Sequence, residues 1–168
     1  NMGITVVAAI IAHDRLYVSH AGDSRAYLIR QGHINRLTLD HTWVQEALDA
    51  GQLTPQQAAT HPNKNVVKRY LGTNEPLIVD NQIIHLTGSA EVNRSRRLIP
   101  GLILQRGDVV LLCTDGLTDL VTDKEILQVV KKYQNNAQKT ADKLVDLANQ
   151  KGGIDNITAV VMAWQDES

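Results

Sequence analysis

Short apolar runs separated by two or three polar residues fill the first 37 residues, and they constrain the fold more than any other feature. The runs cover residues 4–12, 16–21, 25–30 and 33–37 and are rich in Val, Ile, Leu and Ala. Two strands joined by a few polar residues are typical of an antiparallel hairpin. The sequence therefore predicts an antiparallel meander at the start of the chain.

From Thr42 onward the apolar spacing changes to that of helices. Val44, Ala47 and Leu48 lie on one helical face, and Thr54-Pro55-Gln56-Gln57 is typical of a capping box with proline at the first helical position. We expect a further helical turn over residues 66–71, followed by strands over 77–79 and 83–86. Residues 87–100 are polar and are interpreted as a loop. Its Arg94, Arg96 and Arg97 are either solvated or a docking surface for phosphorylated substrates.

The last third of the chain combines one buried strand, two helices and a final strand. Val109–Cys113 is entirely apolar, and Thr122 with Glu125 predicts a capping box that opens a helix to Tyr133. A second amphipathic helix follows from Ala137 and ends at Gly152-Gly153, before a strand over residues 157–164. Strands followed by helices in this order indicate an α+β fold with helices packed on sheets.

Composition limits the class of protein. With 43% hydrophobic and 21% charged residues over 168 positions, the chain is typical of one globular domain, and the absence of Phe makes its core aliphatic. A net charge of −1 offers no general attraction for nucleic acid. The single cysteine, Cys113, lies inside an apolar strand and excludes a disulfide framework within the chain and a Cys-cluster zinc site. We expect a cytoplasmic domain over residues 1–168 without a membrane span.

Three aspartates follow or precede predicted strands. Asp23 lies in Gly-Asp-Ser-Arg, Asp115 comes after the strand 109–113, and Asp155 precedes the final strand. Each one alone is also ordinary turn chemistry. If they converge at one rim, they must share a cation, because two carboxylates about 4 Å apart repel by ~4 kcal/mol at an effective dielectric near 20. With no Cys cluster and no close pair of histidines, the chemistry favours Mg²⁺ or Mn²⁺ and metal-assisted hydrolysis of a phosphate ester.

Six sequence blocks carry a resemblance to a known family. They are Met-Gly-Ile-Thr at 2–5, Ala-Gly-Asp-Ser-Arg-Ala at 21–26, Leu-Asp-His-Thr at 39–42, the stretch 61–72, Gly-Asp-Val-Val-Leu-Leu-Cys-Thr-Asp-Gly-Leu at 107–117 and Gly-Gly-Ile-Asp-Asn-Ile-Thr at 152–158. Their order and content resemble the bacterial-type members of the metal-dependent protein phosphatases, the PPM or type 2C family. The blocks extend over nearly the whole chain.

The resemblance implies a four-layer α/β-β/α sandwich, with two antiparallel sheets flanked by helices. It implies hydrolysis of phosphoserine and phosphothreonine by water activated at two Mg²⁺ or Mn²⁺ ions. Asp115 and Asp155 match metal ligands of that centre, and Asp23 matches a ligand of a third, weaker site. Residues 40–72 match the flap beside the active site, where flap packing is favoured over catalysis for His41 and His61. Implied partners are phosphorylated proteins, including a Ser/Thr kinase or its targets.

The chain also departs from the family pattern. The phosphate-binding Arg, the Glu-Asp pair, the Asp-Gly-x-Gly-Gly block with its metal-bridging aspartate and the proposed general-acid histidine have no counterpart in this sequence. We therefore expect the C-terminal two-thirds of a phosphatase domain, incomplete at the N-terminus and weakly active or inactive alone, with no catalytic residue identifiable beyond the metal ligands. An inactive phosphatase-like module that binds or regulates stays open as the alternative. An unrelated Mg²⁺-dependent nuclease ranks last, because the chain lacks a basic surface.

Overall fold

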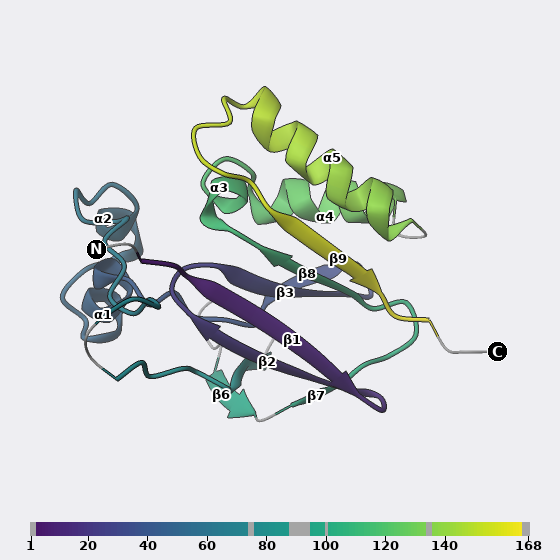
Figure 1. Ribbon diagram of the computed structural model, residues 1–168, viewed down its shortest axis with the longest axis horizontal. Coiled ribbons are helices and arrows are strands. Elements are labelled where there is room, and N and C mark those ends of the chain that lie inside the picture. Colours follow the sequence, from purple (N-terminus) through teal and green to yellow (C-terminus); the bar gives the residue numbers. More distant parts are fainter. Residues whose placement is uncertain (1–2, 74–75, 88–94, 100, 134–135, 166–168) are drawn as a thin grey trace.

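The computed structural model describes residues 3–73, 76–87, 95–99, 101–133 and 136–165 (Figure 1). Its first part contains β1 (Val6–Ala12), β2 (Arg15–Ala21), β3 (Arg25–Arg30) and β4 (His33–Arg36). They form two antiparallel hairpins, β1-β2 and β3-β4, rather than the predicted continuous meander, because β2 and β3 lie in different sheets. Two short helices and three strands follow: α1 (Trp43–Asp49), α2 (Pro55–Ala59), β5 (Ile83–Thr87), β6 (Ser95–Ile99) and β7 (Leu102–Ile103). The last part contains β8 (Val109–Cys113), α3 (Asp115–Thr118), α4 (Asp123–Tyr133), α5 (Ala137–Gln150) and β9 (Ala159–Ala163).

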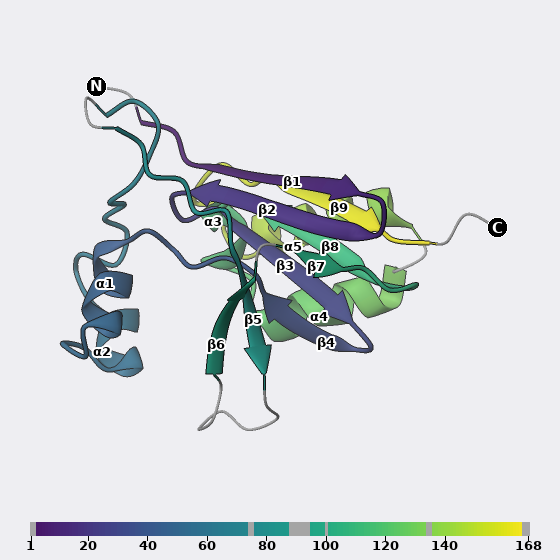
Figure 2. The same cartoon turned by 90° about the horizontal axis from the view of Figure 1, so that it is seen from below.

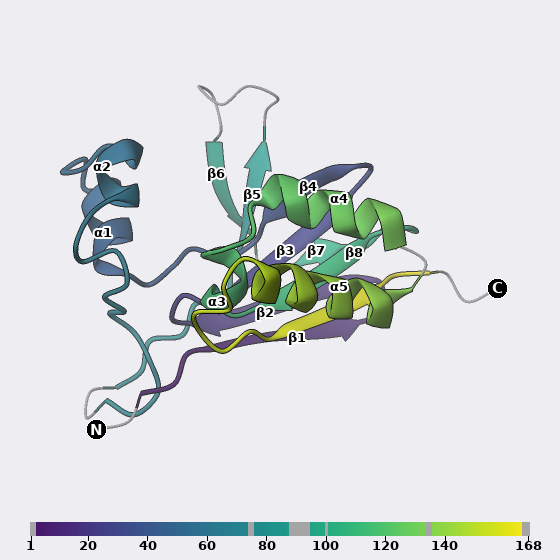
Figure 3. The same ribbon diagram turned by 90° about the horizontal axis from the view of Figure 1, so that it is seen from above.

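These strands form two main antiparallel sheets. One has the order β1-β2-β7, the other β4-β3-β8-β9, and β5 pairs with β6 in a separate hairpin. Figures 1 and 3 show α4 and α5 across one face of the four-stranded sheet, and Figure 2 shows the β1-β2-β7 sheet against the opposite face. The predicted pair of antiparallel sheets with flanking helices is confirmed.

The four-stranded sheet is buried on both faces, and its residues alternate between two cores. Tyr27 and Ile29 of β3 pack with Leu111 of β8 against the helices. Their neighbours Ala26 and Leu28 instead pack toward Leu16 and Val18 of the other sheet. Because side chains alternate along a strand, one apolar run serves two cores. This explains why the runs are continuously apolar rather than alternating with polar residues.

The local signals for helix ends are confirmed. Thr54 and Gln57 form the predicted capping box, with the Gln57 N–H donating to the Thr54 hydroxyl and the Thr54 N–H donating to the Gln57 side chain. Thr122 and Glu125 make the same reciprocal pair before α4. Such boxes depend on residues three apart in the chain, and so they are readable from sequence.

Three predictions for the middle of the chain are wrong. Residues 66–71 are not helical, because Val67 pairs with Thr42 and Leu71 pairs with Ile4. Residues 77–79 form no strand, and the only pairing there is the isolated bridge between Asp80 and His20. The loop predicted over 87–100 contains strand β6, which includes Arg96 and Arg97, whereas Arg94 lies outside the described residues.

The outer face of the β1-β2-β7 sheet exposes apolar side chains. Ile10 and Tyr17, which are cross-strand partners, are 67% and 40% exposed. The described residues therefore form three layers: the β1-β2-β7 sheet, the four-stranded sheet, and the helices α4 and α5 (Figure 1). Within those same residues, we find no helix with the length and apolar character needed to cross a bilayer.

Truncation of a core side chain in α5 is expected to destabilise the fold strongly. Leu144 is fully buried in the core between the helices and the four-stranded sheet, so Leu144→Ala removes its contacts and leaves a cavity that costs about 2–5 kcal/mol. Urea unfolding followed by circular dichroism measures the loss. Ile10→Ala, at the exposed face, is the matched control and should change the free energy of unfolding by less than about 0.5 kcal/mol. Equal effects of the two substitutions would contradict this description of the core.

Candidate metal centre

The register of the four-stranded sheet brings the three predicted aspartates to one edge. Arg25 at the start of β3 pairs with Cys113 at the end of β8, and Cys113 pairs with Ala159 at the start of β9. Asp23 precedes the first of these strands, Asp115 follows the second and Asp155 precedes the third. Antiparallel pairing therefore places all three carboxylates at the same end of neighbouring strands.

Thr114 ties the Asp115 turn to the Asp155 turn. Its hydroxyl donates to the Asn156 carbonyl at 3.0 Å and accepts from the Thr158 N–H at 3.0 Å. Gly116 allows the close approach, because a Cβ at this position would lie 2.4 Å from the Asn156 oxygen. The Asp-Gly sequence is thus a packing requirement between two turns.

Each of these two turns also uses part of its own carboxylate. The Gly116 N–H donates to Asp115 Oδ1 at 2.9 Å, and the Asn156 N–H donates to Asp155 Oδ1 at 2.7 Å. The turn interpretation of each aspartate is therefore correct as local structure. It does not compete with ligand binding, since the second carboxylate oxygen of each residue has no part in these bonds.

The carboxylates also interact electrostatically. Burial, together with repulsion from Asp115, raises the pKa of Asp23 from 3.8 to about 6. Burial and repulsion from Asp155 likewise raise the pKa of Asp115. Asp115 is therefore the middle member of the row, and it interacts with a carboxylate on each side. Asp23 is buried, whereas Asp155 is exposed.

A separate ion network holds the segment after β4 beside this edge. Arg25 donates to both oxygens of Asp40, at 3.1 Å from Nε and 2.7 Å from a terminal nitrogen, and Arg36 forms a second ion pair with Asp40. Although burial lowers the pKa of Arg25, the bonds to Asp40 raise it well above its ordinary value. Because the Asp40 carboxylate is paired with two guanidinium groups, its role is structural.

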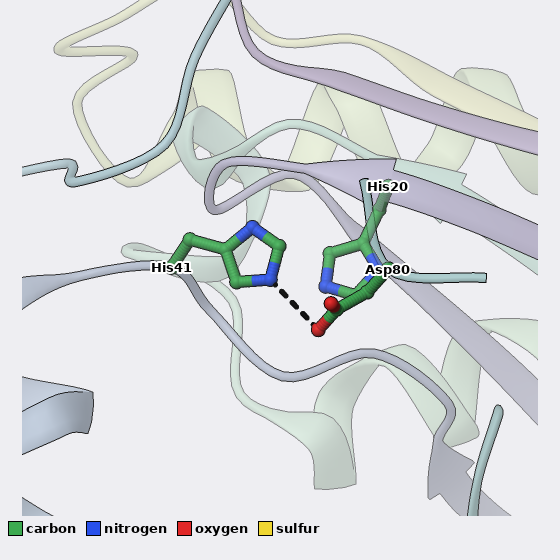
Figure 4. A group of neighbouring side chains, drawn as sticks. All are labelled: His20, His41 and Asp80. Carbon is green, nitrogen blue, oxygen red and sulfur yellow. Dashed lines mark hydrogen bonds and ion pairs between the residues drawn. The ribbon is translucent and has the colours of Figure 1, made fainter. Parts of the chain in front are cut away.

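One sequence prediction at this edge is wrong. The sequence offered no close pair of histidines, yet the rings of His20 and His41 stack with centroids 4.5 Å apart (Figure 4). Asp80 joins them, with Oδ2 at 3.0 Å from His41 Nε2. In the described part of the chain, these three residues are the only set of three His, Cys, Asp or Glu whose ligand atoms all lie within 4.8 Å. No local pattern signals this cluster, because its members come from three separate segments.

The two predicted flap histidines differ in their surroundings. His41 is buried at the point where the chain leaves the sheet. His61 lies beyond α2, where its ring stacks on Trp43 with centroids 4.6 Å apart and its Nδ1 accepts from the Asn63 N–H. His61 thus packs within the segment of α1 and α2, whereas His41 contacts the body of the fold.

Comparison with known proteins identifies the family. Residues 1–47 and 103–157, more than half of the chain, match the protein phosphatase 2C family. The protein phosphatase PhpP of Streptococcus pneumoniae is 38% identical over 168 residues, which is 99% of this chain and 60% of PhpP. This chain belongs to the protein phosphatase 2C family.

Solved structures of the family agree with this assignment. The serine/threonine phosphatase of S. agalactiae superimposes with a TM-score of 0.81 at 34% identity, covering 98% of this chain and 60% of its own. The catalytic domain of PstP in complex with two manganese ions gives a TM-score of 0.75 at 33% identity, covering 99% of this chain and 60% of its own. The chain therefore spans about 60% of the length of these phosphatases.

The Thr114 bridge predicts a selective effect of two substitutions. Thr114→Val keeps the side-chain shape but removes both hydrogen bonds, so it should lower the free energy of unfolding by about 1–3 kcal/mol. Thr114→Ser keeps the hydroxyl and should stay within about 0.5 kcal/mol of the parent. Chemical denaturation of the three proteins checks this, and equal stability of Thr114→Val and Thr114→Ser would show that the bridge contributes nothing.

The raised pKa of Asp23 predicts a pH dependence of stability in protein kept free of metal with a chelator. The folded state binds this proton more tightly than the unfolded state, so Asp23 stabilises the fold below pH 4 and loses that contribution as the pH rises through about 6. Asp23→Asn should flatten the decline in unfolding free energy between pH 4 and pH 7. Urea titrations at each pH measure the slope. Asp142→Asn, at an exposed position on α5, serves as the control, and an unchanged slope in Asp23→Asn would contradict the assignment.

Proposed function

We propose that this chain forms the C-terminal two-thirds of the domain of a metal-dependent serine/threonine protein phosphatase, as one domain over residues 1–168. The observation that carries the proposal is the convergence of Asp23, Asp115 and Asp155 at one sheet edge, where burial and mutual repulsion raise the pKa of Asp23 and of Asp115. Carboxylates placed together in this way are poised to accept cations.

The donor set fits Mg²⁺ or Mn²⁺. All three side chains offer hard carboxylate oxygens, which these ions prefer. The three do not form one compact set of ligand atoms within 4.8 Å, and Asp115 interacts with a neighbour on each side. This spread favours separate ions that share Asp115, one beside Asp155 and a further one beside Asp23. The manganese ions in the related PstP structure support the choice of metal.

Each residue has a distinct task in this proposal. Asp115 is the shared ligand, and the Thr114 bridge fixes it relative to Asp155. Asp23 exchanges a proton for a cation at its carboxylate, since its raised pKa keeps a fraction of it protonated near pH 6. When bound, the ions would polarise a phosphoryl oxygen and lower the pKa of a coordinated water. The residues of this chain supply the charge and the fixed geometry that such binding requires.

The substrates in this proposal are phosphorylated proteins, among them a Ser/Thr kinase or its targets. The segment of residues 40–72 is proposed as the flap, which lies beside the sheet edge and carries α1 and α2 (Figure 2). Lys68 of this segment, whose ion pair with Glu46 is exposed to solvent, is a cationic side chain suited to a phosphorylated peptide. Family membership supports this substrate class.

The first test is Mn²⁺ binding by calorimetry. The chain should bind Mn²⁺, and Asp115→Asn should weaken the affinity at least about tenfold, because this residue serves more than one ion. Asp155→Asn should have a smaller effect. Asp142→Asn, a loss of the same charge on the exposed face of α5, is the matched control and should bind as the parent does. Unchanged affinity in Asp115→Asn would contradict the proposed centre.

Hydrolysis is tested in two forms of the protein with a phosphothreonine peptide and p-nitrophenyl phosphate. The chain alone should show little turnover, because it has no Asp-Gly-x-Gly-Gly block. Fusing to Asn1 the segment of a 2C-family relative that carries this block should produce Mn²⁺-dependent turnover, which Asp115→Asn then lowers by orders of magnitude. A folded, Mn²⁺-binding fusion without turnover would instead support the regulatory alternative.

A further inference from the structure

The ring of His41 makes a directional bond on each side. Its Nδ1 lies 3.1 Å from the Gly22 backbone nitrogen, which can only donate, so Nδ1 is the acceptor. In the neutral ring the proton is then on Nε2, which donates to Asp80 Oδ2 at 3.0 Å. The contact of Arg69 with Nε2, at 3.4 Å, is consequently no hydrogen bond, and Arg69 instead pairs with Asp80 Oδ1 at 3.2 Å.

The ring of His20 packs against the ring of His41. Its Nε2 lies 2.7 Å from the Leu39 carbonyl oxygen, which can only accept, so this nitrogen also carries the proton. The remaining Nδ1 is buried and has no hydrogen-bond partner. Burial lowers the pKa of His20, and the neighbouring His41 lowers it further, which keeps the stacked ring neutral.

A metal ion is the obvious alternative for His20, His41 and Asp80, and the hydrogen bonds argue against it. The one lone pair of neutral His41 already accepts from Gly22, and its other nitrogen is protonated. The two rings are also stacked within 16° of parallel. Because imidazole lone pairs lie in the ring plane, rings stacked in this way do not direct them to a common point. The cluster is therefore arranged for hydrogen bonding within the protein.

Residues 41–80 form an excursion, in which the chain leaves the sheets, forms α1 and α2 and returns. The cluster of His20, His41 and Asp80 lies at the two ends of this excursion. The His41 N–H donates to the Gly22 carbonyl at 2.9 Å immediately before α1. Asp80, at the end of the excursion, exchanges two backbone bonds with His20 at 2.9 and 3.0 Å. Arg69, from within the excursion, pairs with the Asp80 side chain. The imidazole of His41 thus connects both ends of the excursion to the turn that carries Asp23, as Figure 4 shows for His41 and Asp80.

We propose that His41 is a positioning residue that clamps the base of the flap, through Asp80, to the Gly22–Asp23 turn of the metal centre. Gly22 has a φ of +115°, and a Cβ at this position would lie 2.4 Å from the Thr5 side chain, so this turn requires glycine. The bond from Gly22 to His41 stabilises the conformation of this turn, and the bond from His41 to Asp80 makes it depend on the point where the chain returns from the flap to the sheets. The role of Asp23 as a ligand rests on the proposed function, whereas the clamp itself does not.

The test uses ¹⁵N-labelled protein of all 168 residues. Long-range nitrogen spectra of the imidazoles should show His41 with its proton on Nε2. Hydrogen exchange at the Gly22 amide should speed up roughly fivefold to tenfold in Asp80→Ala, because the clamp loses one bond. Asp80→Asn keeps an acceptor oxygen and should restore slow exchange. The side chain of Asp80 is 42% exposed, so these variants are expected to fold.

Two further variants separate the two bonds of His41. His41→Asn places an amide oxygen where Nδ1 lies, so Gly22 should remain protected while the contact with Asp80 is lost. His41→Ala removes both bonds and should expose Gly22 to exchange. His33→Asn makes the same chemical change at an exposed position on β4, at the opposite end of the sheet, and should leave Gly22 unchanged.

Movement of the Asp23 amide and carboxyl signals in Asp80→Ala, with rescue in Asp80→Asn, would support the clamp; unchanged Asp23 signals or unchanged Gly22 exchange would overturn it. A proton on Nδ1 of His41 would also overturn it, as would Zn²⁺ binding that shifts both His20 and His41. Since none of these measurements needs hydrolysis or Mn²⁺, the proposed function can fail while the clamp stands, and the reverse.

Discussion

The antiparallel pairing of β3 with β8 and of β8 with β9 is the constraint on which the rest of the structure depends. It places the start of β3, the end of β8 and the start of β9 at one edge, so turns from three parts of the chain carry their carboxylates to the same place. The same pairing puts one face of the sheet under α4 and α5 and the other against β2. A shift by one residue would exchange the two faces and separate the aspartates. Fold and site are therefore specified by a single register.

The boundary between the sheets and the excursion of α1 and α2 is polar rather than apolar. Asp40 binds two arginines there, and His41 binds Gly22 and Asp80. Apolar contacts tolerate sliding, whereas hydrogen bonds and ion pairs at low dielectric are directional and are lost when groups move by about an ångström. A polar boundary can consequently hold the segment of α1 and α2 in one orientation relative to the sheets. It joins the segment of α1 and α2 to the end of the sheet that carries the three aspartates.

What the sequence could predict follows from the range of the interactions involved. The capping boxes at Thr54 and Thr122 and the hairpin strands depend on neighbours in the chain, and they were confirmed. The predicted aspartates could be placed at a common edge because each adjoins a strand of recognisable pattern. Residues 66–71 were misread as helix because their pairing with Ile4 and Thr42 is long-range. The stacking of His20 on His41 escaped prediction for the same reason, since no spacing rule connects their segments.

Cys113 is the last residue of β8, between Arg25 of β3 and Ala159 of β9, and that position gives the protein a reporter of opening at this end of the sheet. Its side chain is 2% exposed within β8, and burial raises the pKa of the thiol to about 12. Because the thiol is buried, a reagent reaches it when the end of β8 separates from β3 and β9 or from the helices. As this is the single cysteine of the chain, the rate of alkylation would measure how often this end of the sheet opens.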